Sequence, residues 1–559
     1  MAQILSCTSL RDCCLIRRIR SIFPIGFKTE TVELVKMSVP MFLSQMMLLL
    51  VNFVSTIFCG HLGRVELAAV SLAISVINVT GISIGIGLAS ACDTLISQTF
   101  GGGNHFRIGV ILQQAILILL LACFPCWAIL INTEPILLGV RQEPEIARLA
   151  QMYVKIFMPA LPVSVLLFYF FTHKGWIQGV CVSFQAAFMF ALQIRYLQNQ
   201  GIIWPQVITG LVANIFNALI NYIVIFVLNL GLTGSAVAGC LSNFAMVGIL
   251  WIYIICKGLH KATWGGWSRD CLKDWGPYLR LAIPSMVMLC VEWWTYEIGG
   301  FLAGLISEVE LGAQSVVYQL SNIAYMFPMG FSLAGSIRVG NALGAGNTDQ
   351  AKLCTKVTLF CAVSVSVCLA ILVGCLKDHI SFVFTYDEQI RKRVSDIISF
   401  YAPFILLDAT SAACGGIIRG AGKQKIGAVC YMLGYYAIGF PIGVPLMFTA
   451  KLGIKGLWTG LFVCMFLQCS FLVIYMVRMN WDKVTAEVLI ILMQCYDATV
   501  EESDSLELVH TGPSAAGSCG SEELSFTALI LHRGLALAAM LFILAVGITI
   551  NVLVQNLIK

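Results

Sequence analysis

An internal repeat is the feature that most constrains the fold of this 559-residue chain. The run VELAA at 65–69 recurs as VELGA at 309–313, and the pair VP at 39–40 recurs as IP at 283–284, both at an offset of 244 residues. Each copy consists of apolar runs, separated by polar or glycine-rich breaks, that are long enough to cross a bilayer as helices. The sequence therefore predicts an all-α polytopic membrane protein with two pseudo-symmetric six-helix lobes.

Composition supports this fold class and excludes several others. The chain is 59% hydrophobic and 11% charged, whereas soluble proteins carry about 25% charged residues. The net charge of +5 is scattered, so nothing predicts nucleic-acid binding. The 22 cysteines lie without framework spacing, mostly in apolar runs, and are interpreted as small buried residues rather than metal ligands. No catalytic, metal or cofactor motif is found, so we do not expect an enzyme.

Apolar runs and the breaks between them give the expected organisation. We expect a cytosolic N-terminal segment at 1–36, a first lobe at 37–257, a cytosolic inter-lobe loop at 258–280, a second lobe at 281–479, a cytosolic linker at 480–533 and a thirteenth helix at 534–559. Basic residues in and beside the inter-lobe loop, from Lys257 to Arg280, place it in the cytosol by the positive-inside rule, together with the N-terminus.

The first lobe also contains extra residues. Leu230-Gly231 matches Leu452-Gly453 at an offset of only 222 instead of 244, so about 22 residues are inserted upstream in the first lobe. We place this insertion near 163–187. A further membrane crossing there would move the basic inter-lobe loop to the opposite side, so we expect the insertion to add none.

Two carboxylates interrupt the apolar run at 281–306, and they are the first candidate site residues. A carboxylate in hydrocarbon costs a few kcal/mol or more, so Glu292 and Glu297 require a compensating role. Helical spacing places Tyr296 one turn from Glu292 and Trp293 one turn from Glu297. Acids beside aromatic faces suit an organic cation. The alternative is structural: each acid is buried against a basic side chain or a backbone donor and only holds two helices together, and Arg338 is the nearest basic candidate downstream.

Several separated motifs resemble one known family. The runs CGHLG at 59–63, SQTFG at 97–101, VEWWTYE at 291–297 and RVGNALGAGN at 338–347 are similar to motifs of the multidrug and toxin extrusion (MATE) family. The resemblance extends from about residue 35 to residue 481. The thirteenth helix resembles that of the animal branch of the family.

This resemblance implies a proton-coupled antiporter that exports organic cations by alternating access, without ATP hydrolysis. It implies a monomer among the lipids of the plasma membrane, at the apical surface. Glu292 and Glu297 match acidic positions of the family's seventh helix, and Asp408 matches one on the tenth. Trp293, Tyr296 and Tyr318 match aromatic positions near the family's cavity. Gln319 is a departure from the family pattern, because animal relatives often carry Glu at this position.

We expect proton and cation to compete for a shared acid. Burial favours the neutral form of a carboxyl group, so a proton from outside displaces the bound cation. One alternative is a lipid-linked sugar flippase of related architecture, which would need basic residues in its cavity. The other is a non-transporting membrane receptor, which would need neither the repeat nor two acids on one helix. Gln319 can donate and accept hydrogen bonds but cannot titrate, so we expect altered substrate preference or proton linkage.

Overall fold

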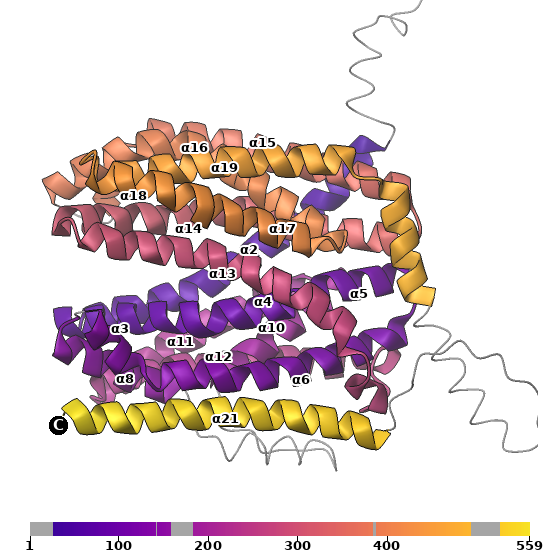
Figure 1. The fold of residues 1–559 in the computed structure, drawn as a ribbon, viewed down its shortest axis with the longest axis horizontal. Helices are drawn as coiled ribbons and strands as arrows, with labels where there is room; N and C mark the ends of the chain where they lie inside the picture. The colour runs from indigo at the N-terminus through magenta and orange to yellow at the C-terminus, as the bar shows by residue number, and fades with distance from the viewer. Residues whose placement is uncertain (1–25, 141, 158–182, 384–386, 494–525, 559) are drawn as a thin grey trace, which may run out of the picture.

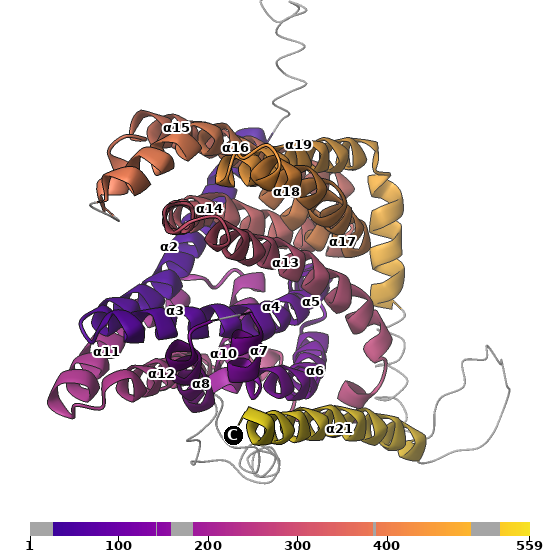
Figure 2. The same ribbon diagram turned by 60° about the vertical axis from the view of Figure 1, so that its left-hand side comes forward.

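A computed structural model describes residues 26–140, 142–157, 183–383, 387–493 and 526–558 (Figure 1). Regular structure within these ranges is helical, and ten segments in them are long and apolar enough to cross a membrane. The prediction of an all-α polytopic membrane protein is confirmed. Figures 1 and 2 show two lobes packed against each other, with the C-terminal helix α21 (Phe526–Ile558) lying along the outside of the first lobe.

The first lobe is built from one long helix, a four-part helical segment and the helices that follow. In order these are α2 (Phe27–Gly60), α3 (Arg64–Ile77), η1 (Asn78–Ile82), α4 (Ser83–Ala89), α5 (Ala91–Gly101), α6 (His105–Leu130), α7 (Thr133–Gly139), α8 (Pro144–Phe157), α10 (Ser183–Asn199), α11 (Trp204–Tyr222), η2 (Ile223–Val227) and α12 (Gly231–Cys256). Residues 65–101 act as one apolar span despite the short π-helical turn η1.

Two short 3₁₀ turns lead into the second lobe, whose helices are mostly longer and less interrupted. They are η3 (Leu259–Ala262), η4 (Arg269–Leu272), α13 (Trp275–Gly304), α14 (Glu308–Gly344), α15 (Thr348–Cys375), η5 (Ile380–Val383), α16 (Glu388–Gly420), α17 (Gln424–Met432), η6 (Leu433–Gly439), α18 (Phe440–Phe448) and α19 (Ile454–Arg478). The thirteenth helix is α21 (Phe526–Ile558).

Several helices extend beyond their expected limits. α2 begins at Phe27, inside the segment expected to be a cytosolic extension, because its charged Glu30 is buried against the second lobe. Residues 481–493 are helical rather than part of a linker, and Trp481 and Val488 are buried in the second-lobe core. α21 begins at Phe526 rather than 534. The rest of the expected linker, 494–525, lies outside the described residues.

The predicted insertion falls largely outside the described residues as well. Of the range 163–187, only 183–187 are described, and they form the start of α10. α8 and α10 both pack against α12, whereas the corresponding segment of the second lobe is the unbroken helix α16. That the insertion adds no crossing stays a prediction.

The first helix of each lobe crosses to the other lobe. The first half of α2 packs on α14 and α15, and its second half packs on α11. Leu34 and Met41 of α2 form a small hydrophobic cluster with Leu333 and Ile337 of α14. α13 behaves similarly: it starts beside α4, α5 and α6 before it joins α14 and α17. The lobes are thus interlocked through α2 and α13.

The thirteenth helix has defined contacts with the first lobe and with the inter-lobe loop. Asn132 donates from Nδ2 to the carbonyl oxygen of Gly547 at 2.9 Å, and Asn551 donates to that of Ile131 at 3.0 Å. At the other end of α21 the Arg533 guanidinium lies 4.0 Å from the ring centroid of Trp275. Its Nε donates to the carbonyl oxygen of Leu272 at 3.1 Å. α21 therefore contacts the first residue of α13.

Candidate functional site

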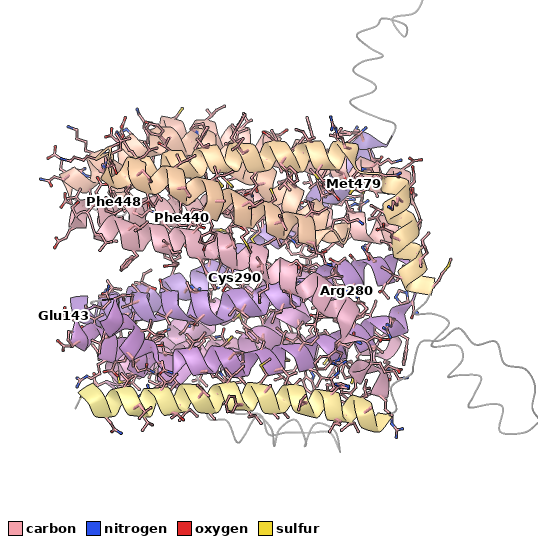
Figure 3. The ribbon with its side chains drawn as sticks, in the orientation of Figure 1. Glu143, Arg280, Cys290, Phe440, Phe448 and Met479 are labelled. Atoms are coloured by element: carbon pink, nitrogen blue, oxygen red, sulfur yellow. The ribbon has the colours of Figure 1, made fainter. Side chains whose placement is uncertain are left out.

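The two acids on α13 have different surroundings. Figure 3 labels Cys290, two residues before Glu292, at the junction between the lobes. Glu292 is partly buried and lies near the Tyr325 side chain of α14. Glu297 is also partly buried, and it lies near Ser75 on α3 of the first lobe and interacts electrostatically with Tyr318 on α14 of the second. Glu292 thus belongs to the second-lobe interior, whereas Glu297 lies between the two lobes.

Asp408 joins Glu292 in the second lobe. Its side chain on α16 is buried, with a relative exposure of 5%. Both carboxylates interact electrostatically with Tyr296 of α13 and with Tyr325 of α14. We call these four residues the acidic cluster. The fold therefore brings together the acidic positions of α13 and α16, which are distant in the sequence.

Aromatic rings surround this cluster. Tyr296 stacks on Tyr318 with ring centroids 5.6 Å apart, and it lies 6.3 Å from the Trp458 ring of α19. Trp458 makes edge contacts with Tyr401 and Phe404 of α16, both at 5.4 Å. Aromatic side chains of four helices, α13, α14, α16 and α19, therefore meet beside the two acids.

The other two candidate residues are less closely tied to the cluster. Trp293 is partly buried on α13, one turn from Glu297, as the helical spacing predicts. Gln319 follows Tyr318 on α14, but its side chain is exposed, whereas Tyr318 is only partly so. Adjacent residues on a helix point about 100° apart, so Gln319 does not share the direction of Tyr318.

Sequence reasoning missed several residues of the site. Tyr325 lies seven residues, or about two helical turns, after Tyr318, so helical spacing could have identified it. Trp458 and Arg419 reach the site from α19 and α16, and only the tertiary fold reveals them. Tyr431 of α17 also interacts electrostatically with Glu292.

The structural alternative with Arg338 as partner is wrong. Arg338 pairs instead with Glu30 of α2, with Nη2 donating to Oε2 at 2.6 Å. Gln350 and Cys354 donate to the same carboxylate at 2.5 Å and 3.0 Å. The ion pairs found among the described residues include none with Glu292, Glu297 or Asp408. Over the same part of the chain, no group of His, Cys, Asp and Glu side chains is arranged to hold a metal ion.

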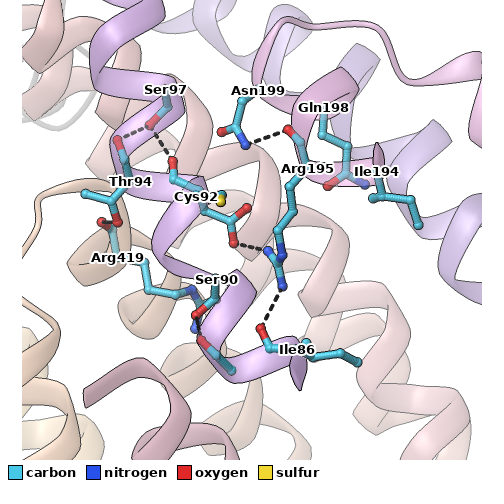
Figure 4. Close-up of polar contacts among 12 residues, drawn as sticks. Ile86, Ser90, Cys92, Thr94, Ser97, Ile194, Arg195, Gln198, Asn199 and Arg419 are labelled. Carbon is cyan, nitrogen blue, oxygen red and sulfur yellow. Dashed lines mark hydrogen bonds and ion pairs between the residues drawn. The ribbon is translucent and has the colours of Figure 1, made fainter. Parts of the chain in front are cut away.

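The first lobe has its own buried ion pair (Figure 4). Asp93 of α5 forms an ion pair with Arg195 of α10, and their side chains are only 4% and 11% exposed. Arg195 also donates to the carbonyl oxygen of Ile86 at 3.3 Å. This pair fastens α10 to the α4–α5 segment, which is a structural role.

Close packing joins the lobes at one end of the molecule. Thr94 of α5 donates to the carbonyl oxygen of Arg419 at 2.6 Å, and Gln98 donates to that of Gly420 at 3.0 Å. A side chain at Gly101 or Gly344 would collide with the backbone of the opposite lobe, so glycine is required there. We call this contact between α5 and the ends of α14 and α16 the inter-lobe seal.

Basic residues are more numerous at the end of the molecule that carries the seal than at the opposite end. Figure 3 shows Arg280 and Met479 at this end, with Glu143 and Phe448 at the opposite end. The helix ends and loops on the side of the seal carry Lys28, Lys36, Lys257, Lys261, Arg269, Lys273, Arg280, Lys352, Lys356, Lys423, Lys425, Arg478 and Lys483. Those at the opposite end carry Arg64, Arg148, Lys377, Arg391, Lys392, Arg393, Lys451 and Lys455. This asymmetry is the one that the positive-inside rule describes for a cytosolic face.

Comparison with known proteins gives concordant results. The MatE family profile matches residues 40–181 and 284–444, one match in each lobe. The chain is 54% identical to multidrug and toxin extrusion protein 1 of Danio rerio, over 98% of this chain and 95% of the relative. It is 43% identical to the protein of that name from Homo sapiens, over 95% of each chain. The crystal structure of the eukaryotic MATE transporter AtDTX14 superposes with a TM-score of 0.77 at 26% identity, over 84% of this chain and 100% of that one.

Proposed function

The chain belongs to the multidrug and toxin extrusion family, and from this premise we propose that it exports organic cations across the plasma membrane in exchange for protons. The observation that carries the proposal is the acidic cluster: Glu292 and Asp408 lie together among aromatic rings, and within the described ranges neither forms an ion pair with a basic side chain. The cluster thus offers negative charge to a guest.

The chemistry of the cluster suits an organic cation. Aromatic faces such as those of Tyr296 and Tyr318 attract cations through the ring quadrupole. Glu292 and Asp408 supply opposite charge at a distance from water, where the interaction is stronger than at the surface. Two neighbouring buried carboxylates also hold a proton readily, because they cannot both stay ionised without a cation nearby. The same groups can therefore bind either a proton or a cation.

Competition between the proton and the organic cation for the same carboxylates results in their exchange across the membrane. A proton that arrives from outside neutralises Glu292 and removes the charge that holds the organic cation, which then leaves. The cation and the proton cross in opposite directions on one carrier. Gln319 takes no part as a titrating group, so we expect the variation at this position to alter substrate preference or proton linkage.

The closed seal and the charge asymmetry support an orientation. We assign the face of the inter-lobe seal, with its basic loops and the N-terminal segment, to the cytosol. With the seal closed, the acidic cluster is shut off from the cytosol and can communicate only with the other side. Rocking of the interlocked lobes would then open the seal and complete alternating access. The apical surface and a monomeric state are further parts of this proposal.

Transport into proteoliposomes tests the proposal. The purified chain is reconstituted with an acidic lumen, and uptake of a radiolabelled quaternary ammonium compound is followed after dilution into alkaline buffer. We expect the outward proton gradient to drive uptake. Glu292→Gln should reduce this uptake at least about tenfold, the effect of losing roughly 1.4 kcal/mol of cation binding.

The matched control is Glu308→Gln, which removes the same charge from an exposed position at the start of α14. Its uptake should equal that of the parent. Uptake that ignores the pH gradient, or that survives Glu292→Gln unchanged, contradicts the proposal.

A further inference from the structure

We propose that Arg419 is a positioning residue that holds the inter-lobe seal closed whenever Glu292 is ionised and empty. This inference rests on the proposed function, because it explains how an antiporter avoids moving without a guest. Arg419 is suited to this role because its side chain lies near the acidic cluster while its main chain belongs to the seal.

The side chain of Arg419 runs back along α16 toward the middle of the lobe. Its Nη2 donates to the Ser332 hydroxyl of α14 at 3.2 Å. Its Nη1 lies 3.7 Å from the place where a side chain at Gly415, one turn earlier, would begin. The Tyr431 hydroxyl lies 3.2 Å from that same place. The guanidinium is thus held beside Tyr431, a neighbour of Glu292.

Arg419 has no ion-pair partner within 4.0 Å among the described residues, although it is only partly exposed. Met288 of α13, one helical turn before Glu292, has its Cε 3.9 Å from the same place at Gly415, so Arg419 lies close to the part of α13 that carries Glu292 and interacts with it electrostatically. A partly buried cation is unfavourable without a counter-charge. The ionised form of Glu292 therefore stabilises the observed position of the Arg419 side chain.

Other titratable groups around the pair do not substitute for this interaction. From the elements that pack here they are Tyr296 of α13, Tyr325 of α14, Tyr401 and Asp408 of α16, Tyr431 of α17, Tyr435 of η6, Cys469 of α19, and Cys92 and Asp93 of α5. Asp93 is paired with Arg195, and Asp408 interacts electrostatically with Glu292 rather than with Arg419. Arg419 is the basic group that acts on Glu292.

The main chain of Arg419 is part of the seal (Figure 4). Its carbonyl oxygen accepts a hydrogen bond from Thr94 of the first lobe at 2.6 Å and one from Gln424 of α17 at 3.4 Å. Gln424 also donates to the Thr94 hydroxyl at 2.6 Å. Movement of Arg419 therefore disturbs a direct contact between the two lobes.

Because the Arg419 side chain interacts with Glu292 while its main chain belongs to the seal, the charge on Glu292 determines when the seal opens. With Glu292 ionised and empty, the guanidinium is attracted toward it and the seal is held. A proton or an organic cation at Glu292 cancels the negative charge, so the guanidinium loses its counter-charge and the seal is weakened. Either guest thus permits the transition, whereas the empty ionised carrier stays closed, which is the condition for coupled exchange.

The test compares coupling in proteoliposomes containing the parent, Arg419→Gln, Arg419→Lys and a matched control. The control is Lys425→Gln, which removes the same charge at an exposed position nearby on α17. We expect Arg419→Gln to permit net uptake of a quaternary ammonium compound without a pH gradient, about tenfold above the parent. Arg419→Lys should restore coupling at least in part, and Lys425→Gln should behave like the parent.

Thr94→Val supplies a second route if Arg419→Gln does not fold. It removes one of the hydrogen bonds across the seal, the one to the Arg419 carbonyl oxygen, and leaves both charges, so we expect uncoupled uptake with an unchanged KM for the cation. Tight coupling in every variant that folds overturns the inference. A parent without gradient-driven uptake overturns the proposed function instead, so the two failures are distinguishable.

Discussion

Glu30 offers a sharp test of how the lobes are held together. It lies on α2 of the first lobe and receives hydrogen bonds from Arg338, Gln350 and Cys354 of the second. Glu30→Gln keeps the shape of the side chain but removes its charge. Arg338 then remains at the interface without a counter-charge.

The size of the effect follows from the burial of the pair. The Glu30 side chain is 4% exposed and that of Arg338 is 23% exposed. Breaking a fully buried pair costs about 3–5 kcal/mol, and breaking a surface pair costs about 0–1 kcal/mol. An intermediate cost of about 2–3 kcal/mol applies here, which lowers the population of the sealed state roughly 30- to 160-fold relative to the open one.

Hydrogen exchange followed by mass spectrometry measures this change. We expect faster exchange in peptides covering 91–101 and 340–346, which form the seal. The matched control is Glu33→Gln, because Glu33 pairs with Lys36 on the same helix, three residues apart, with both side chains well exposed. That change should cost no more than about 0.5 kcal/mol and leave the seal peptides unaltered. Equal exchange in the two variants refutes the reasoning.

Further predictions concern the first lobe and the thirteenth helix. Asp93→Asn strands the buried Arg195 and should lower the free energy of unfolding by about 3–5 kcal/mol, whereas Asp93→Leu combined with Arg195→Met should recover most of the loss. Thermal unfolding monitored by size-exclusion chromatography measures both, and a single variant as stable as the parent contradicts the assignment. Arg533→Ala removes the contacts with Trp275 and Leu272 and should weaken docking of α21 by about 1–2 kcal/mol. Retention of α21 after cleavage at a protease site introduced in 494–525 measures this, and unchanged retention contradicts it.

The sequence predicts the architecture well because the repeat and the apolar runs are local signals. Helix ends are harder to predict when charged side chains have distant partners. Glu30 and Arg338, as charged residues, each predict a solvent-exposed position when considered alone, and only the fold shows that they form an ion pair. Trp481 and Val488 likewise lie in a segment whose polar residues indicate a linker, yet both are buried in the second-lobe core.

The candidate site likewise combines features that local sequence signals predict with contacts that only the fold reveals. Two carboxylates in an apolar run identify α13, and helical spacing gives the aromatic neighbour of each. Spacing along one helix cannot show that Glu292 belongs to the second-lobe interior and Glu297 lies between the lobes, because the answer depends on what packs against each side. Arg419 was missed for a related reason: it ends a different helix, and its importance comes from its position between the seal and the acidic cluster.

The crossing of α2 to the second lobe has a consequence for how the chain is made. Glu30 leaves the ribosome 308 residues before Arg338, so the first helix carries an acid without its counter-charge through more than half of translation. Neither half of the molecule is then a self-sufficient unit of biogenesis. A product truncated before α14 would retain an uncompensated acid and an uncovered apolar face on α2, both of which cellular quality control can recognise.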